Sequence, residues 1–290
     1  MFLFYFLHTC SHLMCMLARL QHNEYLINFD SCLGEGLQGQ VYEAVHCKSG
    51  EICVAKVTNF ARDSQRKAFL NECRILTTIS HCKSVVEMKK WFLITLENGS
   101  ECGVFILEKY PTDLMSLLED EELCSKEKLN IFKQVSQGID EIHANGVAHL
   151  DIKPENILVS ADRRTIKLID FGNAQILPAD GLVTSSGGTM VYTAPETLQG
   201  GNFNGKFADI WSLGILFHVL ISSHWPYPQS MAVNLRTQVA SGLLSIHESL
   251  SKSQVKAFRK MCQLDPNNRA VSFPKRSTKS KFKNIFVKPS

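Results

Sequence analysis

One stretch of the sequence decides its fold: His149-Leu150-Asp151-Ile152-Lys153-Pro154-Glu155-Asn156-Ile157-Leu158-Val159. It places a carboxylate, an ammonium group and an amide at Asp151, Lys153 and Asn156, directly before three apolar residues. Asp151 alone would be interpreted as a solvated carboxylate in a turn. A second carboxylate, Asp170, follows fourteen residues after Asn156. This combination of charged and amide groups indicates a functional cluster rather than a simple turn.

A glycine-rich segment lies closer to the N-terminus and has the pattern G-x-G-x-x-G-x-V. Its residues are Leu33, Gly34, Glu35, Gly36, Leu37, Gln38, Gly39, Gln40 and Val41. Dinucleotide-binding sites share G-x-G-x-x-G, but there the glycines open a helix. Here a strand-like alternation follows over Gln40–Val45, so the segment joins two strands. Glycines let backbone N–H groups approach phosphate oxygens, which predicts a phosphate-binding flap. An ordinary glycine hairpin is the alternative for this segment alone.

The next strand-like run carries a lysine among apolar residues, in Val54-Ala55-Lys56-Val57. Burying an ammonium group costs free energy unless it meets an anion. Glu72 supplies a carboxylate, because it shares a helix face with the apolar residues Phe69 and Leu76. We therefore expect a Lys56–Glu72 pair that holds the ammonium toward the α- and β-phosphates of a nucleotide.

The hydrophobic pattern changes from strand-like to helical along the chain. Short β-rich runs separated by turns extend to about Leu107, interrupted by one helix expected over Ser64–Ile79. After Pro111 the pattern is helical, with Ser125 as the expected N-cap of a long helix. Residues 209–221 are apolar nearly all round and too short to span a membrane, which indicates a buried helix. The sequence predicts an α+β fold with a β-rich lobe (25–108) and a mainly helical lobe (111–270). A cleft between the lobes is the default ligand site.

Composition excludes several classes of protein. The chain has 290 residues, of which 44% are hydrophobic and 20% charged, so it is not a disordered protein. The net charge of +3 is too small for a dedicated nucleic-acid binder, and no nucleic-acid partner is expected. The ten cysteines show no C-x-x-C spacing and lie singly in apolar runs. Free thiols of this kind indicate an intracellular protein, which we expect in the cytoplasm, with the nucleus as an alternative.

The two ends of the chain differ from its middle. Residues 1–24 form an apolar extension, and residues 1–18 carry no formal charge. We expect this extension to pack on the domain or to precede a later start at Met14 or Met16. A membrane anchor is the alternative, disfavoured by polar residues such as His8 and His12. Residues 271–290 form a basic tail that lacks a helical pattern.

The quoted motifs together resemble the eukaryotic serine/threonine protein kinase family. The catalytic-loop pattern H-x-D-x-K-x-x-N is followed by Asp170-Phe171-Gly172 and then by Ala194-Pro195-Glu196. Arg269 is similar to the arginine that, in this family, pairs with the glutamate of the Ala-Pro-Glu motif. The order and spacing match over about residues 25–270. With so little sequence outside this region, the chain fits a viral or a divergent eukaryotic enzyme.

The resemblance implies a role for each matching residue. Asp151 would orient the attacking hydroxyl and accept its proton, and Lys153 would neutralise charge on the γ-phosphate. Asn156 and Asp170 would bind Mg²⁺, and ATP would be the phosphoryl donor. The nucleotide site would comprise the glycine-rich segment together with Ala55, Lys56, Glu72, Glu108, Tyr110 and Leu158. Protein serine and threonine side chains would be the substrates, and the enzyme is expected to be a monomer.

Two features bear on the type of kinase and on its regulation. Gly188-Thr189-Met190-Val191-Tyr192 resembles a Ser/Thr-type substrate platform, in which Thr189 would bond Asp151 and Lys153. Leu150 stands where many kinases have an arginine that clamps a phosphorylated activation segment, and leucine cannot pair with phosphate. The same His-Leu-Asp sequence occurs in kinases that resemble the myosin-light-chain and death-associated groups. A pseudokinase scaffold and a small-molecule kinase of the same fold are the alternative functions.

Overall fold

The computed structural model describes residues 24–36, 39–95, 99–120, 122–184, 187–228 and 234–269. The predicted tail 271–290 and the predicted extension, except for Glu24, therefore lie outside the described residues. The chain divides into two units. Unit 1 takes its described residues from Met1–Ser80 and Val86–Lys109, and unit 2 from His81–Val85 and Tyr110–Ser290.

Unit 1 is built on a five-stranded antiparallel sheet with the strand order β1-β2-β3-β5-β4. The strands are β1 (Tyr25–Gly36), β2 (Gly39–His46), β3 (Ile52–Asn59), β4 (Met88–Thr95) and β5 (Glu101–Glu108). Side chains that alternate along the strands meet in one buried cluster, because successive residues of a strand point to opposite faces. The cluster includes Ala44, Cys53, Ala55, Val104 and Ile106.

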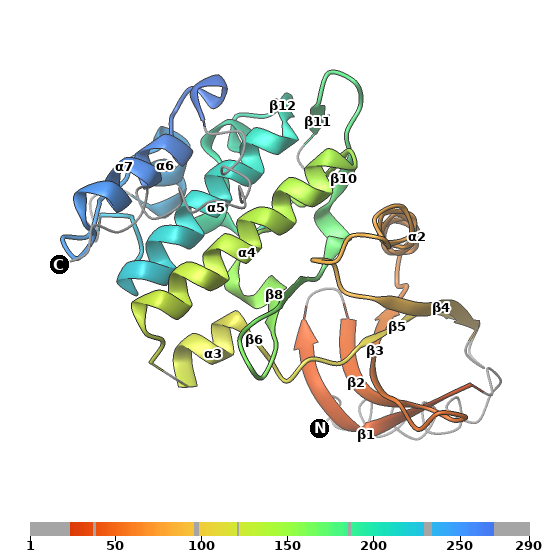
Figure 1. Ribbon diagram of the computed structural model, residues 1–290. Coiled ribbons are helices and arrows are strands. Elements are labelled where there is room, and N and C mark those ends of the chain that lie inside the picture. Colours follow the sequence, from red (N-terminus) through yellow and green to blue (C-terminus); the bar gives the residue numbers. More distant parts are fainter. Residues whose placement is uncertain are drawn as a thin grey trace, which may run out of the picture. The chain divides into compact units, whose positions relative to one another are not determined.

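The helix α2 (Asp63–Thr78) packs beside this sheet through aromatic rings (Figure 1). The Phe69 ring contacts Phe105 of β5 with a centroid separation of 4.4 Å and Trp91 of β4 at 6.2 Å. The same helix face carries Cys73 and Leu76, both buried. Glu72, which lies between Phe69 and Leu76 in the sequence, is buried as well, as the helical spacing predicted.

Unit 2 is mainly helical. Its helices are α3 (Leu114–Asp120), α4 (Ser125–Ala144), α5 (Gly205–Ser222), α6 (Leu235–Ser241) and α7 (Lys252–Met261). Helix α5 packs against α4 and α7, and α4 and α5 lie side by side in Figure 1. In the part of the chain that the structure describes, α5 has the length and apolar composition of a membrane span, yet 78% of that window is buried inside the protein. A buried core helix passes the same test, so α5 is the core helix predicted from the sequence.

Short strands in unit 2 hold the loops between the helices. A three-stranded sheet has the order β6-β8-β9, formed by β6 (Thr112–Asp113), β8 (Ile157–Val159) and β9 (Ile166–Leu168). Strand β7 (Val147–Ala148) pairs with β10 (Gln175–Ile176), and β11 (Leu182–Thr184) pairs with β12 (Asn202–Asn204). A β-rich unit with one described helix and a mainly helical unit confirm the predicted α+β class.

The structure corrects several predicted boundaries. Helix α4 begins at Ser125, which makes Cys124 its N-cap and the predicted capping role of Ser125 wrong. The reason is a reciprocal contact, in which the backbone N–H of Cys124 donates to Glu127 Oε2 at 2.9 Å. Helix α2 spans Asp63–Thr78 rather than 64–79. Helix α5 begins four residues earlier than predicted because the Asn204 side chain caps it, accepting from Phe207 N at 3.2 Å.

A buried histidine on α5 predicts a pH dependence of stability. His218 is fully buried, with Nδ1 2.9 Å from the carbonyl oxygen of His224 and Nε2 3.0 Å from the backbone nitrogen of His247. A neutral ring satisfies both contacts by donating from Nδ1 and accepting at Nε2. Burial lowers the pKa of His218, and the neighbouring rings of His224 and His247 lower that pKa further, although the bond to the His224 carbonyl opposes them.

Because the folded pKa lies below the unfolded one, the stabilisation is complete above about pH 6.5 and is lost as the pH falls toward the folded value. We expect the thermal unfolding midpoint of the wild-type protein to drop between pH 7 and pH 5. His218→Leu should start from a lower midpoint and change less over that range. The exposed His81, replaced in His81→Gln, serves as the control. An equal pH slope in wild type and His218→Leu would contradict this assignment.

Candidate active site

The loop between β7 and β8 carries the residues that the sequence analysis placed at the centre of the site. Leu150 has a φ of 63°, a left-handed conformation that is rare for a residue with a side chain. The loop then enters a short 3-10 helix, Pro154–Asn156, which leads into β8. The predicted apolar run Ile157–Val159 forms β8, which pairs with β9. Asp170 follows two residues after the end of β9.

A carboxylate on α5 holds this loop in place. Asp209 is fully buried, and its Oδ2 and Oδ1 accept the backbone N–H groups of His149 and Leu150, both at 2.8 Å. His143 Nε2 lies 2.7 Å from the same Oδ2. A buried carboxylate keeps such backbone groups satisfied where water cannot reach them. The sequence analysis did not list Asp209 as a site residue, although a charged residue in an otherwise apolar helix was the available signal.

Asp151 and Lys153 lie together with Thr189 in one polar network. Asp151 Oδ1 accepts from both the backbone nitrogen and the hydroxyl of Thr189, each at 2.9 Å. Lys153 Nζ lies 3.2 Å from Asp151 Oδ2 and donates to Thr189 Oγ1 at 2.8 Å. The expected bonds from Thr189 to Asp151 and Lys153 are therefore present. Neighbouring Gly188 has a φ of 110°, and a Cβ there would lie 2.8 Å from the Leu150 carbonyl oxygen, so glycine is required.

The electrostatics of this network keep Asp151 ionised. Burial is the largest single influence and raises the pKa of Asp151. The Lys153 ammonium and the hydrogen bonds from Thr189 together outweigh burial, and the pKa of Asp151 is lowered below its ordinary value. At neutral pH the group is thus a carboxylate that can accept a hydrogen bond from a hydroxyl.

Asn156 and Asp170 offer the oxygen ligands that Mg²⁺ prefers. The Asn156 side chain is oriented by its Nδ2, which donates to the backbone oxygen of Asp151 at 2.8 Å and lies 3.2 Å from Asp151 Oδ2. Its amide oxygen is thereby directed to a different partner. Asp170 is half-buried and has a φ of 62°. The described residues contain no cluster of three His, Cys, Asp or Glu side chains that could hold a metal alone. The donor set fits an ion that takes its remaining ligands from phosphate and water.

Unit 1 contains the predicted lysine–glutamate pair. Lys56 Nζ lies 3.0 Å from Glu72 Oε1 and 3.2 Å from Oε2, and both side chains are mostly buried. The pair joins β3 to α2, as the spacing on the predicted helix implied. It fixes the direction of an ammonium group that would otherwise move freely on its four-carbon stem.

The glycine-rich segment joins β1 to β2 in this unit, as predicted. Leu33, Gly34 and Glu35 are exposed at the end of β1, while Gln40 and Val41 pair with Val57 and Lys56 of β3. Gly39 has a φ of 141°, and a Cβ there would collide with the Val57 carbonyl oxygen. Gly36 pairs with Gly39 across the turn. Leu37 and Gln38 lie outside the described residues.

The remaining predicted nucleotide residues are placed as follows. Ala55 is fully buried in β3, and Glu108 ends β5 with its Oε1 accepting from the Glu87 backbone nitrogen at 2.7 Å. Tyr110 and Leu158 belong to unit 2, where both are half-buried and Leu158 lies in β8. The glycine-rich segment, Ala55, Lys56, Glu72 and Glu108 therefore belong to unit 1. The catalytic-loop residues, Asp170, Tyr110 and Leu158 belong to unit 2.

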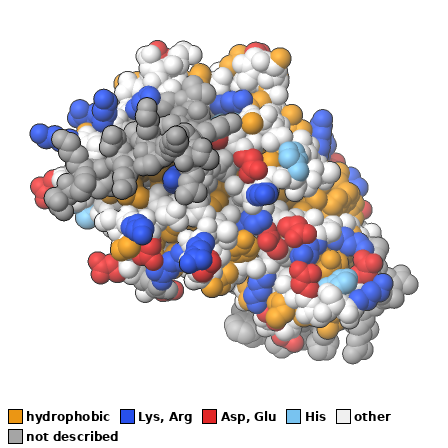
Figure 2. All heavy atoms as spheres, in the orientation of Figure 1, with side chains coloured by type: hydrophobic (Ala, Val, Ile, Leu, Met, Phe, Trp, Pro, Cys, Tyr) orange, Lys and Arg blue, Asp and Glu red, His pale blue; other side chains and the backbone are white. Residues whose placement is uncertain are grey.

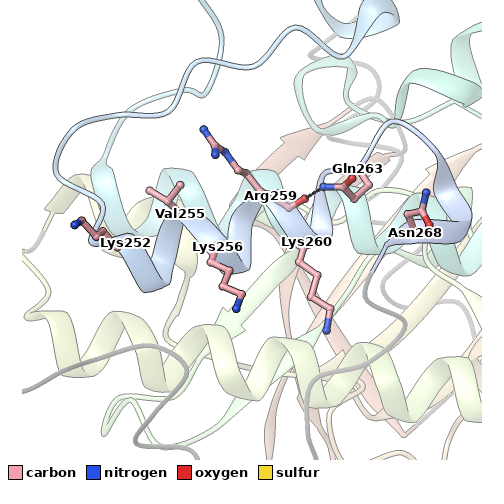
Figure 3. A pocket seen from close by; sticks show the side chains of 7 residues that line it. All are labelled: Lys252, Val255, Lys256, Arg259, Lys260, Gln263 and Asn268. Atoms are coloured by element: carbon pink, nitrogen blue, oxygen red, sulfur yellow. Dashed lines mark hydrogen bonds between the residues drawn. The ribbon is translucent and has the colours of Figure 1, made fainter.

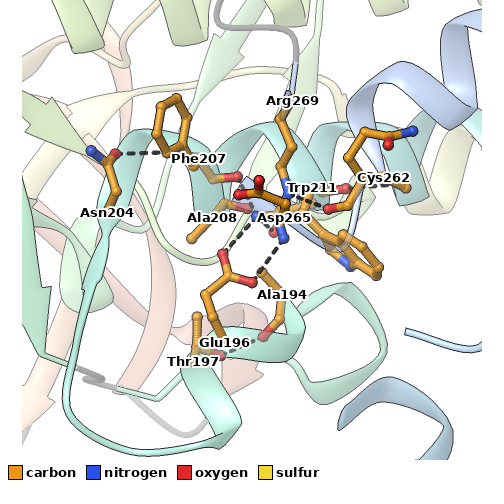
Figure 4. A network of polar contacts seen from close by, with 12 residues as sticks. Ala194, Glu196, Thr197, Asn204, Phe207, Ala208, Trp211, Cys262, Asp265 and Arg269 are labelled. Carbon is orange, nitrogen blue, oxygen red and sulfur yellow. Dashed lines mark hydrogen bonds and ion pairs between the residues drawn. The ribbon is translucent and has the colours of Figure 1, made fainter. Parts of the chain in front are cut away.

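An arginine and a glutamate join distant segments of unit 2 (Figure 4). Arg269 Nη1 and Nη2 lie 2.6 and 2.8 Å from the two carboxylate oxygens of Glu196. Nη1 also donates to the Phe207 carbonyl oxygen at 2.9 Å, and the guanidinium lies 5.0 Å from the Trp211 ring centroid. Ala194-Pro195-Glu196 is thereby tied to α5 and to the end of the described chain, as the resemblance implied.

Comparison with known proteins decides the family. The sequence matches the family described as "Protein kinase domain" over residues 27–280. The chain belongs to the protein kinase family. The match covers the glycine-rich segment, the catalytic loop and the Glu196–Arg269 pair, so the two-lobed kinase fold expected from the motifs is confirmed.

Curated relatives of this kinase domain come from different organisms, and two of the three described below are named as serine/threonine-protein kinases. It is 29% identical over 248 residues to a probable serine/threonine-protein kinase of Dictyostelium discoideum, covering 82% of this chain and 28% of that protein. It is 31% identical over 210 residues to smooth muscle myosin light chain kinase of Gallus gallus, covering 69% of this chain and 10% of that protein. It is 29% identical over 243 residues to CBL-interacting serine/threonine-protein kinase 3 of Arabidopsis thaliana, covering 81% of this chain and 53% of that protein.

These matches confirm the predicted serine/threonine-type kinase family and imply ATP and, typically, Mg²⁺. The kinase spans 10% to 53% of the length of these three relatives. The roles assigned to single residues and the domain boundaries at 25, 108, 111 and 270 stay predictions.

Proposed function

We propose that this kinase transfers the γ-phosphoryl group of Mg·ATP to serine and threonine hydroxyls of proteins. The observation that carries this proposal is the Asp151–Lys153–Thr189 network, which combines an ionised carboxylate with a fixed ammonium group. Phosphoryl transfer depends mainly on positioning and on neutralising charge, and this network offers both. Its proposed partners are ATP and proteins with accessible serine or threonine side chains.

The geometry assigns different tasks to the two oxygens of Asp151. Oδ1 accepts two bonds from Thr189 at 2.9 Å, whereas the nearest donors to Oδ2 lie at 3.2 Å. The weaker contacts leave Oδ2 as the oxygen that accepts the substrate hydroxyl. As the hydroxyl oxygen bonds to the γ-phosphorus, the bond from that phosphorus to the ADP oxygen breaks. Because the pKa of Asp151 is low, its carboxylate mainly orients the hydroxyl, and the proton leaves late in the reaction.

The other site residues would bind the nucleotide. Lys56, fixed by Glu72, would contact the α- and β-phosphates, and Lys153 would neutralise charge on the transferred group. The oxygens of Asn156 and Asp170 would hold Mg²⁺, which supplies charge neutralisation along the phosphate chain. We further propose an intracellular enzyme, because the eight cysteines that the structure describes are free thiols. We also propose that it acts as a monomer.

The test is transfer of labelled phosphate from ATP by the purified full chain, with and without Mg²⁺. Casein, a peptide library and a panel of sugars and amines would be offered as acceptors. We expect Mg²⁺-dependent labelling of protein on phosphoserine and phosphothreonine. Nucleotide binding without any transfer would identify a pseudokinase scaffold, and transfer to a small molecule alone would identify a small-molecule kinase. Either result would overturn the proposal.

We also expect the enzyme to be active without phosphorylation of its activation segment. Residues 173–193 contain no lysine or arginine, and Leu150 offers no charge to a phosphate. Pairing of β11 with β12 already holds Leu182–Thr184, and Gln175 Nε2 donates to the Thr184 carbonyl oxygen at 2.6 Å. Ser185 and Ser186, the other candidate acceptors, lie outside the described residues.

The measurement compares bacterially expressed, phosphatase-treated protein with the variant Thr184→Ala/Ser185→Ala/Ser186→Ala. Both should retain activity close to that of the untreated enzyme. A drop of about a hundredfold in both would show that an activating phosphate is needed after all.

A further inference from the structure

Helix α7 carries a row of basic side chains outside the active site. Lys252, Lys256, Arg259 and Lys260 are all exposed, whereas Phe258 and Met261 on the opposite face are buried. The Phe258 ring packs against His218 of α5, with a centroid separation of 5.1 Å. Packing therefore fixes the orientation of α7 and turns its basic face outward.

The basic residues line a surface pocket of about 380 Å³ (Figure 3). Figure 3 shows Lys256 and Lys260 extending from the same side of the helix, with Arg259 on its other side. Val255 of α7, together with Gln263 and Asn268 beyond its end, completes the lining. Figure 2 shows the molecule in the orientation of Figure 1. Lys and Arg side chains gather on its left side, the side on which α7 lies in Figure 1.

Within the described parts of the chain, no carboxylate pairs with this face of α7. Among the residues that the structure describes, no ion pair joins Lys252, Lys256, Arg259 or Lys260 to an acidic side chain. The single acidic residue between positions 249 and 269 is Asp265. Its carboxylate is occupied locally, because it accepts from Asn267 and Asn268 at 2.9 to 3.0 Å. Four cations on one short helix repel each other, and an anionic partner would relieve that repulsion.

We propose that this face of α7 is a docking site for an acidic polypeptide segment of a partner protein. Lysines four residues apart on a helix are separated by about 6 Å along its axis. Alternate residues of an extended chain are separated by about 6.6 Å and point the same way. An extended segment with glutamate at every second position thus matches the spacing of Lys252, Lys256 and Lys260. This regular spacing favours an extended polypeptide over a lipid surface, whose headgroup charges have no fixed spacing.

The test measures binding of a fluorescein-labelled Glu-Ser-Glu-Ser-Glu-Ser-Glu peptide to the full chain by fluorescence anisotropy. The same peptide with glutamine in place of glutamate is the ligand control. Each exposed ion pair contributes little, so three lysines are changed together in Lys252→Gln/Lys256→Gln/Lys260→Gln. The matched protein control is Lys48→Gln/Lys83→Gln/Lys126→Gln, which removes the same charge from other exposed positions. All variants keep the basic residues of the 271–290 tail.

We expect the glutamate peptide to bind the wild type at least tenfold more tightly than the glutamine peptide. The α7 variant should lose that tenfold difference, and the control variant should keep it within twofold. Binding should weaken as NaCl is raised from 50 to 300 mM, because these charges are exposed. Because binding is measured without ATP, the result does not depend on phosphoryl transfer.

Three outcomes would overturn the proposal. The two peptides could bind equally, or the two triple variants could lose affinity to the same degree, which would indicate a general effect of net charge. In the third, phosphatidylserine vesicles would bind through α7 and displace the peptide from the wild-type protein, which would identify a membrane-facing surface. Thermal unfolding of each variant confirms that the protein remains folded.

Discussion

Asp151→Asn is expected to lower kcat for peptide phosphorylation by about a hundredfold to ten-thousandfold, the range for loss of a positioned proton acceptor. The replacement keeps the shape of the side chain but turns one acceptor oxygen into a donor. The amide oxygen of asparagine can still accept from Thr189, but the NH₂ group at the position of Oδ2 would face the donors Lys153 Nζ and Asn156 Nδ2. The substrate hydroxyl would then meet an NH₂ group or a neutral oxygen in place of a charged acceptor.

The nucleotide should still bind to this variant, because Lys56, Glu72 and Asp170 are unchanged. We would measure kcat and KM with a peptide substrate, and the affinity for Mg·ATP separately by calorimetry. Asp120→Asn, which changes an exposed carboxylate at the end of α3, is the matched control and should leave kcat unchanged. Turnover close to that of the wild type in Asp151→Asn would contradict the role assigned to this residue.

Local spacing was enough to predict the parts of the site that depend on one element or on adjacent elements. Glu72 could be assigned to Lys56 because helical periodicity showed which face of α2 is buried, and a lone ammonium in an apolar strand needs an anion. The strand alternation after Gly39 likewise separated a strand-joining flap from a helix-opening loop. In both cases the local pattern determines which groups face each other.

An unusual helix cap and a contact between distant segments could not be predicted in the same way. The N-cap of α4 depends on the reciprocal contact of Cys124 with Glu127, and cysteine is not among the usual capping residues. The role of Asp209 depends on where the catalytic loop, about 60 residues earlier in the chain, lies relative to α5. Sequence indicated that α5 is buried, but only the packed structure shows which backbone groups its carboxylate meets.

Replacement of Asp209 is therefore expected to lower both stability and activity. Its two oxygens accept from two backbone N–H groups and from His143, all inside the protein. In Asp209→Asn one oxygen becomes an NH₂ donor that must face another donor. Leaving buried donors without acceptors costs about 1–3 kcal/mol each. Two such groups give a loss of about 2–6 kcal/mol. At about 2–4 °C per kcal/mol for a chain of this size, that loss corresponds to a fall of roughly 4–24 °C in the unfolding midpoint.

Activity per folded molecule should fall as well, because the left-handed conformation of Leu150 is held by the same carboxylate. Without that bond the loop can relax, and Asp151 then moves away from Thr189. Ser222→Ala is the matched control on the same helix, since the Ser222 hydroxyl donates at 2.7 Å to the His218 carbonyl oxygen and touches neither the catalytic loop nor the Gly188–Tyr192 segment. It should lower the midpoint less and leave kcat nearly unchanged. A variant Asp209→Asn that is destabilised but fully active when folded would show that Asp209 stabilises unit 2 without positioning the catalytic residue.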